Sequence, residues 1–182
     1  MMRALFVVGC LFSSVGCASS AAEPEPMPAA RAVLLDEHGA EVGKAALTPV
    51  SGGVRIAIEF KGLPPGEHAL HIHNVGDCHV GEGGDKSFAA AGPHFNPFGK
   101  QHGRSNPNGP PAGDLPNFTV GANGTALVDV VANLVTLDEG VPNSLFQPGG
   151  TCLVVHAKPD DNVTDPSGNA GQRLACGVIE KR

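Results

Sequence analysis

Residues 44–60 read KAALTPVSGGVRIAIEF, and this stretch decides the fold class. In its second half the apolar residues Ile56, Ile58 and Phe60 recur at every second position. A period of two predicts a β-strand that buries one of its faces. Residues 51–53, Ser-Gly-Gly, are a turn signal between two apolar runs. The stretch therefore predicts a β-hairpin.

Apolar runs of strand length recur on both sides of this hairpin, separated by turns rich in glycine, proline and asparagine. They occupy residues 31–36, 67–73, 117–120, 125–137, 152–158 and 173–181. We find no amphipathic helix of useful length between them. About eight short strands with frequent turns predict an all-β fold, an antiparallel sandwich or barrel. Residues 74–116 lack periodicity, and so long an irregular segment inside a compact domain is usually functional.

The bulk composition agrees with one domain of this class. The chain has 182 residues, 41% of them hydrophobic, which is enough for a single domain with its own core. It contains 25 glycines and 16 prolines, and only 16% of its residues are charged, a mixture that suits short strands and many turns. The net charge of −6 argues against nucleic acid as a partner, because a phosphate backbone requires a basic face.

The N-terminal segment is expected to be a targeting signal that is not part of the fold. Residues 1–17 read MMRALFVVGCLFSSVGC, in which an arginine precedes an apolar stretch too short to span a bilayer. The last four of these residues resemble a bacterial lipoprotein signal, so Cys17 is a candidate lipid anchor. A plain signal, cleaved near residues 18–22, is the alternative.

The rest of the chain then divides into a tether and a domain. Residues 18–30 are rich in proline, alanine and serine and predict a flexible tether. Residues 31–182 are expected to form the folded domain. We therefore predict an exported protein of the bacterial periplasm or cell envelope that reaches the membrane only through a lipid anchor.

Cysteine usage agrees with export. Of the five cysteines, Cys78, Cys152 and Cys176 lie in the predicted domain. Three cysteines in an exported domain are expected to form one disulfide and leave one thiol. Cys152 lies in the apolar run TCLVVH, which favours a buried free thiol. That leaves Cys78 and Cys176 as the expected pair.

Histidines provide the first indication of chemistry. His71 and His73 are two residues apart in a predicted strand, so their side chains are expected on the same face, with Cα atoms about 6.6 Å apart. Two imidazoles at that spacing can converge on one copper or zinc ion. A pair of surface histidines is the alternative. His94, His102 and His156 follow in the chain, the last at the end of an apolar run.

Five motifs, in order, resemble the copper/zinc superoxide dismutase family. They are HIHNVGDC, AGPHFNP, AGDLPN, CLVVHAKPDD and GNAGQRLACGVI, and the resemblance covers residues 31–182. It implies an eight-stranded antiparallel Greek-key barrel or sandwich with long metal-binding loops. It also implies copper-dependent disproportionation of superoxide to oxygen and hydrogen peroxide. The resemblance is compatible with a homodimer but identifies no surface through which it would form.

The resemblance also implies a role for each site residue. The implied copper ligands are four imidazoles, those of His71, His73, His94 and His156. The implied zinc ligands are His94, which bridges the two metals, and His102 and Asp114. Three further roles fall outside the ligand sets. Arg173 would attract superoxide, and Asp160 would link a copper ligand to a zinc ligand. Cys78 and Cys176 would form the disulfide. His94 would also take up a proton during the cycle and deliver it to the product.

One position departs from the family pattern. The family has a further zinc-ligating histidine three residues before the aspartate, and here that position is Pro111. Because a structural zinc site normally has four ligands, we expect a weakened zinc site. Water could complete it, it could stay empty, or another group such as His79 could bind. We expect His79, with His38 and His68, to be an exposed bystander.

Two other functions are compatible with an exported β-fold. A non-enzymatic copper carrier on the same fold needs only ligands, so the presence of Arg173 beside a full set of copper histidines favours the enzyme. A metal-free adhesive sandwich would not place histidines in register on separate strands. Because the overall charge opposes encounter with an anion, Arg173 must supply a local attractive field. Residues 158–172 are expected to form one wall of the channel.

Overall fold

The computed structural model describes residues 27–81 and 88–182. The expected signal at residues 1–17, the candidate anchor Cys17 and most of the tether at 18–30 therefore lie outside the described residues. Across the described ranges, no helix has the length and apolar character needed to cross a membrane.

The described chain is built from short β-strands and one turn of 3-10 helix at Ala89–Ala91. The strands are β1 (Ala30–Asp36), β2 (Glu41–Val50), β3 (Gly53–Phe60), β4 (Gly66–His68), β5 (Leu70–His73), β6 (Phe118–Val120), β7 (Ala126–Ala132), β8 (Cys152–His156), β9 (Arg173–Val178) and β10 (Glu180–Lys181). The predicted all-β class is confirmed.

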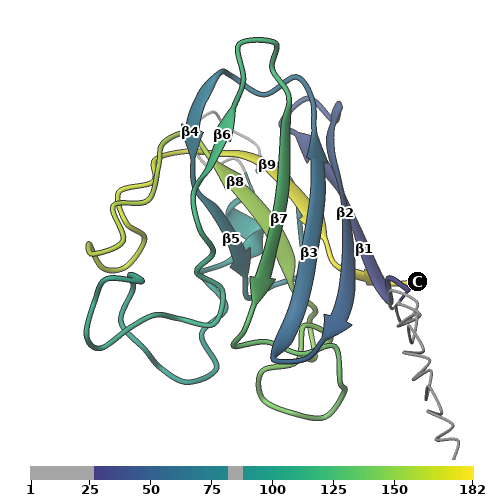
Figure 1. The fold of residues 1–182 in the computed structure, drawn as a ribbon, viewed down its shortest axis with the longest axis vertical. Coiled ribbons are helices and arrows are strands. Elements are labelled where there is room, and N and C mark those ends of the chain that lie inside the picture. The colour runs from purple at the N-terminus through teal and green to yellow at the C-terminus, as the bar shows by residue number, and fades with distance from the viewer. Residues whose placement is uncertain (1–26, 82–87) are drawn as a thin grey trace, which may run out of the picture.

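The strands form a curled antiparallel sheet that is closed by a smaller one (Figure 1). Its order is β5-β8-β9-β1-β2-β3-β7, with β10 also paired to β1. Neighbours such as β1 and β9, or β3 and β7, are far apart in sequence, as the crossovers of a Greek key require. The β4-β6 pair lies between the two ends, because β4 runs into β5 and β6 leads to β7.

The hairpin predicted at residues 44–60 is present. β2 and β3 pair along their length, with Ala45 opposite Ile58 and Leu47 opposite Ile56. Both isoleucines and Phe60 are buried in the barrel core. The turn needs glycine at its end, because a Cβ on Gly53 would lie 2.3 Å from the carbonyl oxygen of a β7 residue. Strand β7 can therefore approach β3 closely enough to extend the sheet.

Three predicted strands differ most from the observed ones. The run at 67–73 is two strands, because its first part pairs with β6 and its second part pairs with β8. The run at 125–137 ends at Ala132, which pairs with Val54 near the start of the antiparallel strand β3. The run at 173–181 breaks at Ile179, whose N–H donates to the carbonyl of Thr151, and β10 then pairs with β1.

Two long loops lie together on one side of the barrel, at the left of Figure 1. One precedes β6 and the other joins β8 to β9. Hydrogen bonds link them: Ser105 N–H donates to the carbonyl of Asn162, and His102 N–H donates to Asp165 Oδ1. The β8–β9 loop is held by Asp161, whose carboxylate accepts four hydrogen bonds from within the loop. Together the loops enclose a site beside β5 and β8.

Candidate metal centre

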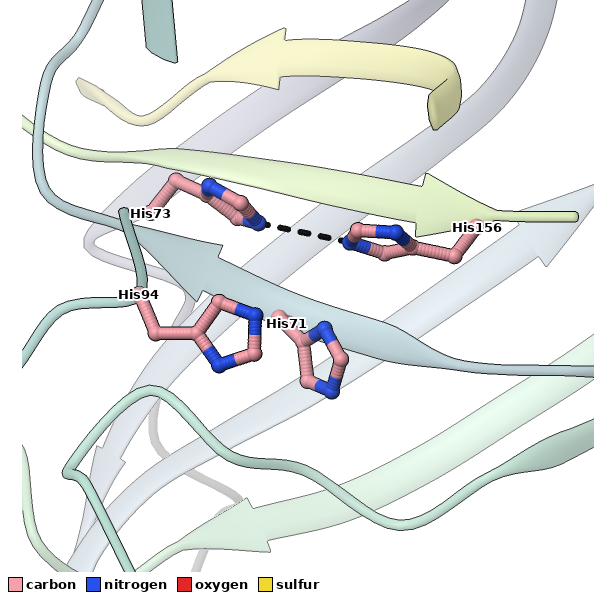
Figure 2. Close-up of side chains that lie close together, drawn as sticks. All are labelled: His71, His73, His94 and His156. Carbon is pink, nitrogen blue, oxygen red and sulfur yellow. Dashed lines mark hydrogen bonds between the residues drawn. The ribbon is translucent and has the colours of Figure 1, made fainter. Parts of the chain in front are cut away.

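Four buried histidines come together beside β5 (Figure 2). His71 and His73 lie on this strand, with the spacing of two that the sequence predicted. His156 ends β8, the strand paired with β5, and His94 lies on the loop that runs beside His73. One nitrogen from each of the four rings lies within 4.8 Å of the others. The fold therefore brings together side chains that are up to 85 positions apart in the sequence.

The hydrogen bonds of two rings determine which nitrogen faces the centre. His73 Nδ1 lies 2.9 Å from the carbonyl oxygen of Gly92, and His156 Nδ1 lies 3.3 Å from that of Gly171. A carbonyl only accepts, so each Nδ1 must donate, and Nε2 of the neutral ring carries the lone pair. The two Nε2 atoms lie 3.4 Å apart, and a dashed line joins the two rings in Figure 2. Both are therefore available as ligand atoms.

The other two rings each leave one buried nitrogen without a hydrogen-bond partner. His71 donates Nε2–H to Asp160 Oδ2 at 2.8 Å, which leaves Nδ1 unpaired. His94 places Nδ1 2.8 Å from Asp114 Oδ1, which leaves Nε2 unpaired. A buried polar atom without a partner is costly unless something else satisfies it. A metal ion bound by these nitrogens would do so, and the donor set of four imidazoles suits copper.

The protonation state of the rings also fits metal binding. Burial, the largest effect, lowers the pKa of His71 to about 4 and that of His156 to about 3. Burial likewise holds the pKa of His73 well below its usual value, and the neighbouring rings and Arg173 act in the same direction. These imidazoles are therefore neutral near pH 7, the form that binds a metal.

A second group of ligands adjoins the first and shares His94 with it. Its members are His94, His102 and Asp114, all buried. Asp114 Oδ2 lies 2.9 Å from His102 Nδ1, but the two groups are not aligned for a hydrogen bond. The same oxygen accepts a hydrogen bond from Gly103 N–H at 3.0 Å. Burial raises the pKa of Asp114, but its close contacts with His102 and His94 and its bond from Gly103 N–H outweigh burial and lower the pKa overall. The carboxylate is thus ionised and suited to a cation.

Asp160 connects the two groups. Its Oδ2 accepts from His71 at 2.8 Å, and its Oδ1 lies 3.0 Å from His102 Nε2. The carboxylate fixes the orientation of one ring from each group, which is the link that the resemblance implied. Gly168 packs against it so closely that an added Cβ would lie 1.8 Å from Oδ1. Only glycine at 168 leaves this bridge undisturbed.

Arg173 lines a cavity of about 860 Å³ together with three of the four histidines, His73, His94 and His156. Its guanidinium donates to the carbonyl oxygens of Phe88 and Gly92, each at 2.6 Å. Because Gly92 O also accepts from His73, one carbonyl fixes both the arginine and a ring of the four-histidine group. Pro166, Ser167, Gly171 and Gln172 form one wall of the cavity, as was expected of the 158–172 loop.

Residues 41–179 match the profile of the family described as copper/zinc superoxide dismutase (SODC). The chain belongs to this family. It is therefore an oxidoreductase of the superoxide dismutase type, as the sequence motifs predicted. The metals of the family are copper and zinc, and the chain carries a buried group of ligands that fits each.

Named relatives agree with this assignment. The chain is 49% identical over 151 residues to superoxide dismutase [Cu-Zn] 2 of Aquifex aeolicus, covering 82% of this chain and 85% of that one. It is 39% identical over 157 residues to an extracellular superoxide dismutase [Cu-Zn] of Brugia pahangi, covering 81% and 73%. A crystal structure of a superoxide dismutase-like protein from Bacillus subtilis aligns with a TM-score of 0.75 at 36% identity, covering 81% and 96%.

Pro111, the departure of this dismutase from the family pattern, is buried three residues before Asp114. Its carbonyl oxygen accepts Asp114 N–H at 3.3 Å, and its side chain offers no ligand atom. His79, the alternative ligand, is 90% exposed and bonds to Asp77. Among the described residues, the group beside Pro111 therefore has three side-chain ligands.

The three histidines that were expected to be exposed bystanders differ in their burial. His38 and His79 are exposed, as expected. The expectation for His68 was wrong: its side chain is buried, and it lies on β4, a different strand from that of His71 and His73. Strand β6 pairs with β4 so that Phe118 is directly opposite His68, and the centroids of the two rings lie 5.9 Å apart. The nitrogens of His68 lie 2.8 Å from the carbonyl oxygens of Pro64 and His156, so the ring fixes the backbone of a neighbouring histidine.

The groups that hold Arg173 and Asp114 in place were missed by sequence reasoning. They are the carbonyls of Phe88 and Gly92 and the amide of Gly103. Backbone groups carry no residue-type signal, so only the folded path of the loops reveals them. By contrast, the expected Cys78–Cys176 disulfide is confirmed, and Cys152 is a buried free thiol.

We predict that the metal-free protein is most stable near pH 6.5. His71, His73 and His156 have lowered pKa values, so below pH 6.5 the unfolded chain binds more protons and stability falls as pH falls. Each ring adds a slope approaching about 1.4 kcal/mol per pH unit. Burial opposes protonation of His102, but its close contacts with the carboxylates of Asp114 and Asp160 raise its pKa to about 9. The stability that this ring contributes is therefore lost as the pH rises from 6.5 to 9.

Urea unfolding of chelator-treated protein between pH 4 and 9.5 measures this dependence. The three lowered pKa values require a steep loss of unfolding free energy on the acid side and a shallower loss on the alkaline side. A free energy that rises as the pH falls from 6.5 to 5 would contradict the assignment of neutral, buried rings.

Proposed function

We propose that this dismutase disproportionates superoxide with a copper ion bound by His71, His73, His94 and His156. The observation that carries the proposal is the convergence of four imidazole nitrogens within 4.8 Å, three of the rings lining a cavity with Arg173. Copper bound there supplies the one-electron chemistry that the reaction needs, which zinc lacks. Three of the ligand nitrogens belong to rings that burial keeps neutral, so they are ready to bind metal near pH 7.

Arg173 is proposed to draw superoxide toward the four histidines and to orient it. The chain carries a net charge of −6, so the attraction must be local. Burial lowers the pKa of the guanidinium, yet an arginine stays charged at any physiological pH. Two carbonyls hold two of its nitrogens, which fixes the remaining N–H groups in direction.

His94 is proposed to take up a proton and deliver it to the reduced product. Its Nδ1 is held by Asp114, and its Nε2, on the side of the other three rings, has no hydrogen-bond partner. A proton taken up at Nε2 would lie beside the cavity where product forms. The bond from Nδ1 to Asp114 orients the ring in the metal-free chain, and zinc bound at Nδ1 would orient it in the loaded protein. In either case Nε2 would be able to deliver the proton to the reduced product.

The function is tested by replacing Arg173 with alanine in copper-loaded protein. We expect the rate constant for superoxide removal at low ionic strength to fall by at least about tenfold, because steering by a local charge changes association rates by such factors. Copper content should stay unchanged, since Arg173 is not a ligand. The difference between wild type and R173A should shrink as salt is added.

The same experiment separates the enzyme from a copper carrier on this fold. A carrier needs only the ligands, so R173A would bind copper as wild type does and neither protein would remove superoxide faster than free copper. Equal rate constants for superoxide removal by wild type and R173A would contradict the proposed role of Arg173.

The zinc group is proposed to bind zinc through His94, His102 and Asp114 with reduced affinity. A structural zinc site normally has four protein ligands, and Pro111 stands where the family has the fourth. We predict that Pro111→His raises zinc affinity and the melting temperature of the zinc-loaded protein. Elemental analysis after dialysis against a chelator measures the first, and calorimetry the second. No change in either would mean that three ligands already hold zinc tightly.

We also propose that the domain, residues 31–182, acts outside the cytoplasm, in the periplasm or cell envelope. The signal-like residues 1–17 and the disulfide support export, because disulfides persist in oxidising compartments. Cys17 would carry the lipid and residues 18–30 would act as the tether. Mass spectrometry of the mature chain tests this: an acylated N-terminal Cys17 is expected, and an unmodified N-terminus near residue 20 would favour a plain signal.

A further inference from the structure

Three sulfur atoms lie together near Arg173. Cys78 and Cys176 form the disulfide, and the thiol of Cys152 lies within 4.8 Å of both sulfurs. Cys152 and Cys176 are fully buried, and they pack with Phe88, Ala91 and Val154 in a small apolar cluster apart from the main core. Neither the copper group nor the zinc group uses Cys152.

The sulfur cluster lies next to the four histidines on the same face of the sheet. Cys152 on β8 is directly opposite His73 on β5, and Val154 is opposite both His71 and Cys176. Directly opposed residues of an antiparallel pair have side chains on one face, with Cβ atoms about 4.5–5.5 Å apart. The sulfur cluster is therefore one strand away from a proposed copper ligand.

We propose that Cys78, Cys152 and Cys176 form a three-thiolate site for cuprous ion in the chain whose disulfide is still reduced. The site exists in newly made protein, or after a dithiol gives two electrons and two protons to the disulfide and itself becomes a disulfide. The three thiols then release three protons as they bind one Cu(I). No electron moves in that binding step.

The environment suits a soft cation. Thiolates prefer Cu(I) to hard cations, and burial keeps water and other ligands away. Burial raises the pKa of the Cys152 thiol to about 12, so it stays protonated unless a cation displaces the proton. The charge of Arg173 acts in the opposite direction on the same thiol and would offset part of the negative charge of the complex. Three sulfurs that already lie within 4.8 Å need little rearrangement.

Closure of the disulfide would empty this site beside His73. When a second disulfide accepts two electrons from the thiolates of Cys78 and Cys176 and two protons from solvent, it becomes a dithiol, the Cys78–Cys176 bond forms, and the Cu(I) loses two of its three ligands. The oxidation state of the copper is unchanged by this exchange. Histidine nitrogens lie on the neighbouring strand, where His73 is directly opposite Cys152, and they are available to take over the ion. The three-thiolate site would thus precede the histidine site during copper loading.

The test uses the full chain with Cys10→Ala and Cys17→Ala, so that the three remaining thiols are those of the cluster. The protein is reduced with a phosphine under anaerobic conditions and titrated with Cu(I) against a chromogenic Cu(I) chelator. X-ray absorption at the copper edge counts sulfur neighbours, and near-ultraviolet bands report thiolate bonding. The variants are C152A and C152S, with Val154→Ala as a control for loss of buried volume in the same cluster.

We expect three sulfur neighbours in the reduced chain and in V154A. C152A and C152S should show at most two, with Cu(I) affinity lower by at least about tenfold, since even outer partners of a metal ligand contribute that much. The oxidised chain should show nitrogen neighbours only. Equal sulfur counts and affinities in the reduced parent and C152A would overturn the proposal. So would a reduced chain that lacks the circular dichroism of the sheet both with and without Cu(I).

Discussion

Replacing His156 with alanine is expected to lower copper affinity, and superoxide removal with it, by more than about a hundredfold. Loss of an outer partner of a metal ligand already costs about 10–100-fold in affinity, and His156 is proposed as a direct ligand. Its Nε2 lies 3.4 Å from that of His73, and its removal leaves three rings of the group. Copper content and activity of the same samples, dialysed against a chelator, measure both effects.

The matched control is His79→Ala. His79 is an exposed histidine outside the group, so copper content and activity should stay at the wild-type level. Circular dichroism of both metal-free variants confirms that the barrel is folded. If H156A retained a full equivalent of copper and wild-type activity, the four-histidine site would be wrong.

Removing the disulfide with Cys78→Ala is expected to lower the unfolding free energy by about 4–5 kcal/mol, the loop-entropy figure for a loop of this length. The cysteines are 98 residues apart, so the bridge restricts a large part of the unfolded chain. Cys78 is half-buried, so loss of its side chain removes little packing. Urea unfolding of metal-free wild type and variant measures the change.

The disulfide variant should also lose activity. The loop that follows Cys78 carries the Phe88 and Gly92 carbonyls, which hold Arg173. Cys152→Ala is the control, because it removes a buried sulfur without opening the bridge, and its effect on stability should be smaller. A decrease of less than about 1 kcal/mol in the unfolding free energy of C78A would show that the disulfide restricts the unfolded chain very little.

Local sequence patterns predicted much of the fold and of the proposed ligand set. The alternation of Ile56, Ile58 and Phe60 predicted a half-buried strand, and β3 is that strand. The spacing of His71 and His73 predicted two rings on one face, because side chains of a strand alternate between faces. Both are properties of a single segment, so they can be read without knowing what packs against it.

Features that depend on pairing between distant segments could not be predicted in this way. The alternation placed His68 on the opposite face from His71 and His73 but gave no sign that its segment pairs with β6, opposite Phe118, or that the ring is buried. Similarly, Cys152 was predicted to be a buried thiol, but its proximity to the disulfide depends on the register of β8 with β9. The role of Asp160 came from family resemblance, since its two histidine partners reach it through separate loops and strands.

The central claim is that His71, His73, His94 and His156 hold a copper ion that disproportionates superoxide. The most direct test is the rate of superoxide decay, followed by stopped-flow absorbance, with copper-loaded protein in the presence of excess chelator. We predict decay that is first order in superoxide, proportional to protein-bound copper and far faster than with the same amount of chelated copper alone. A rate no higher than that of chelated copper would contradict the claim.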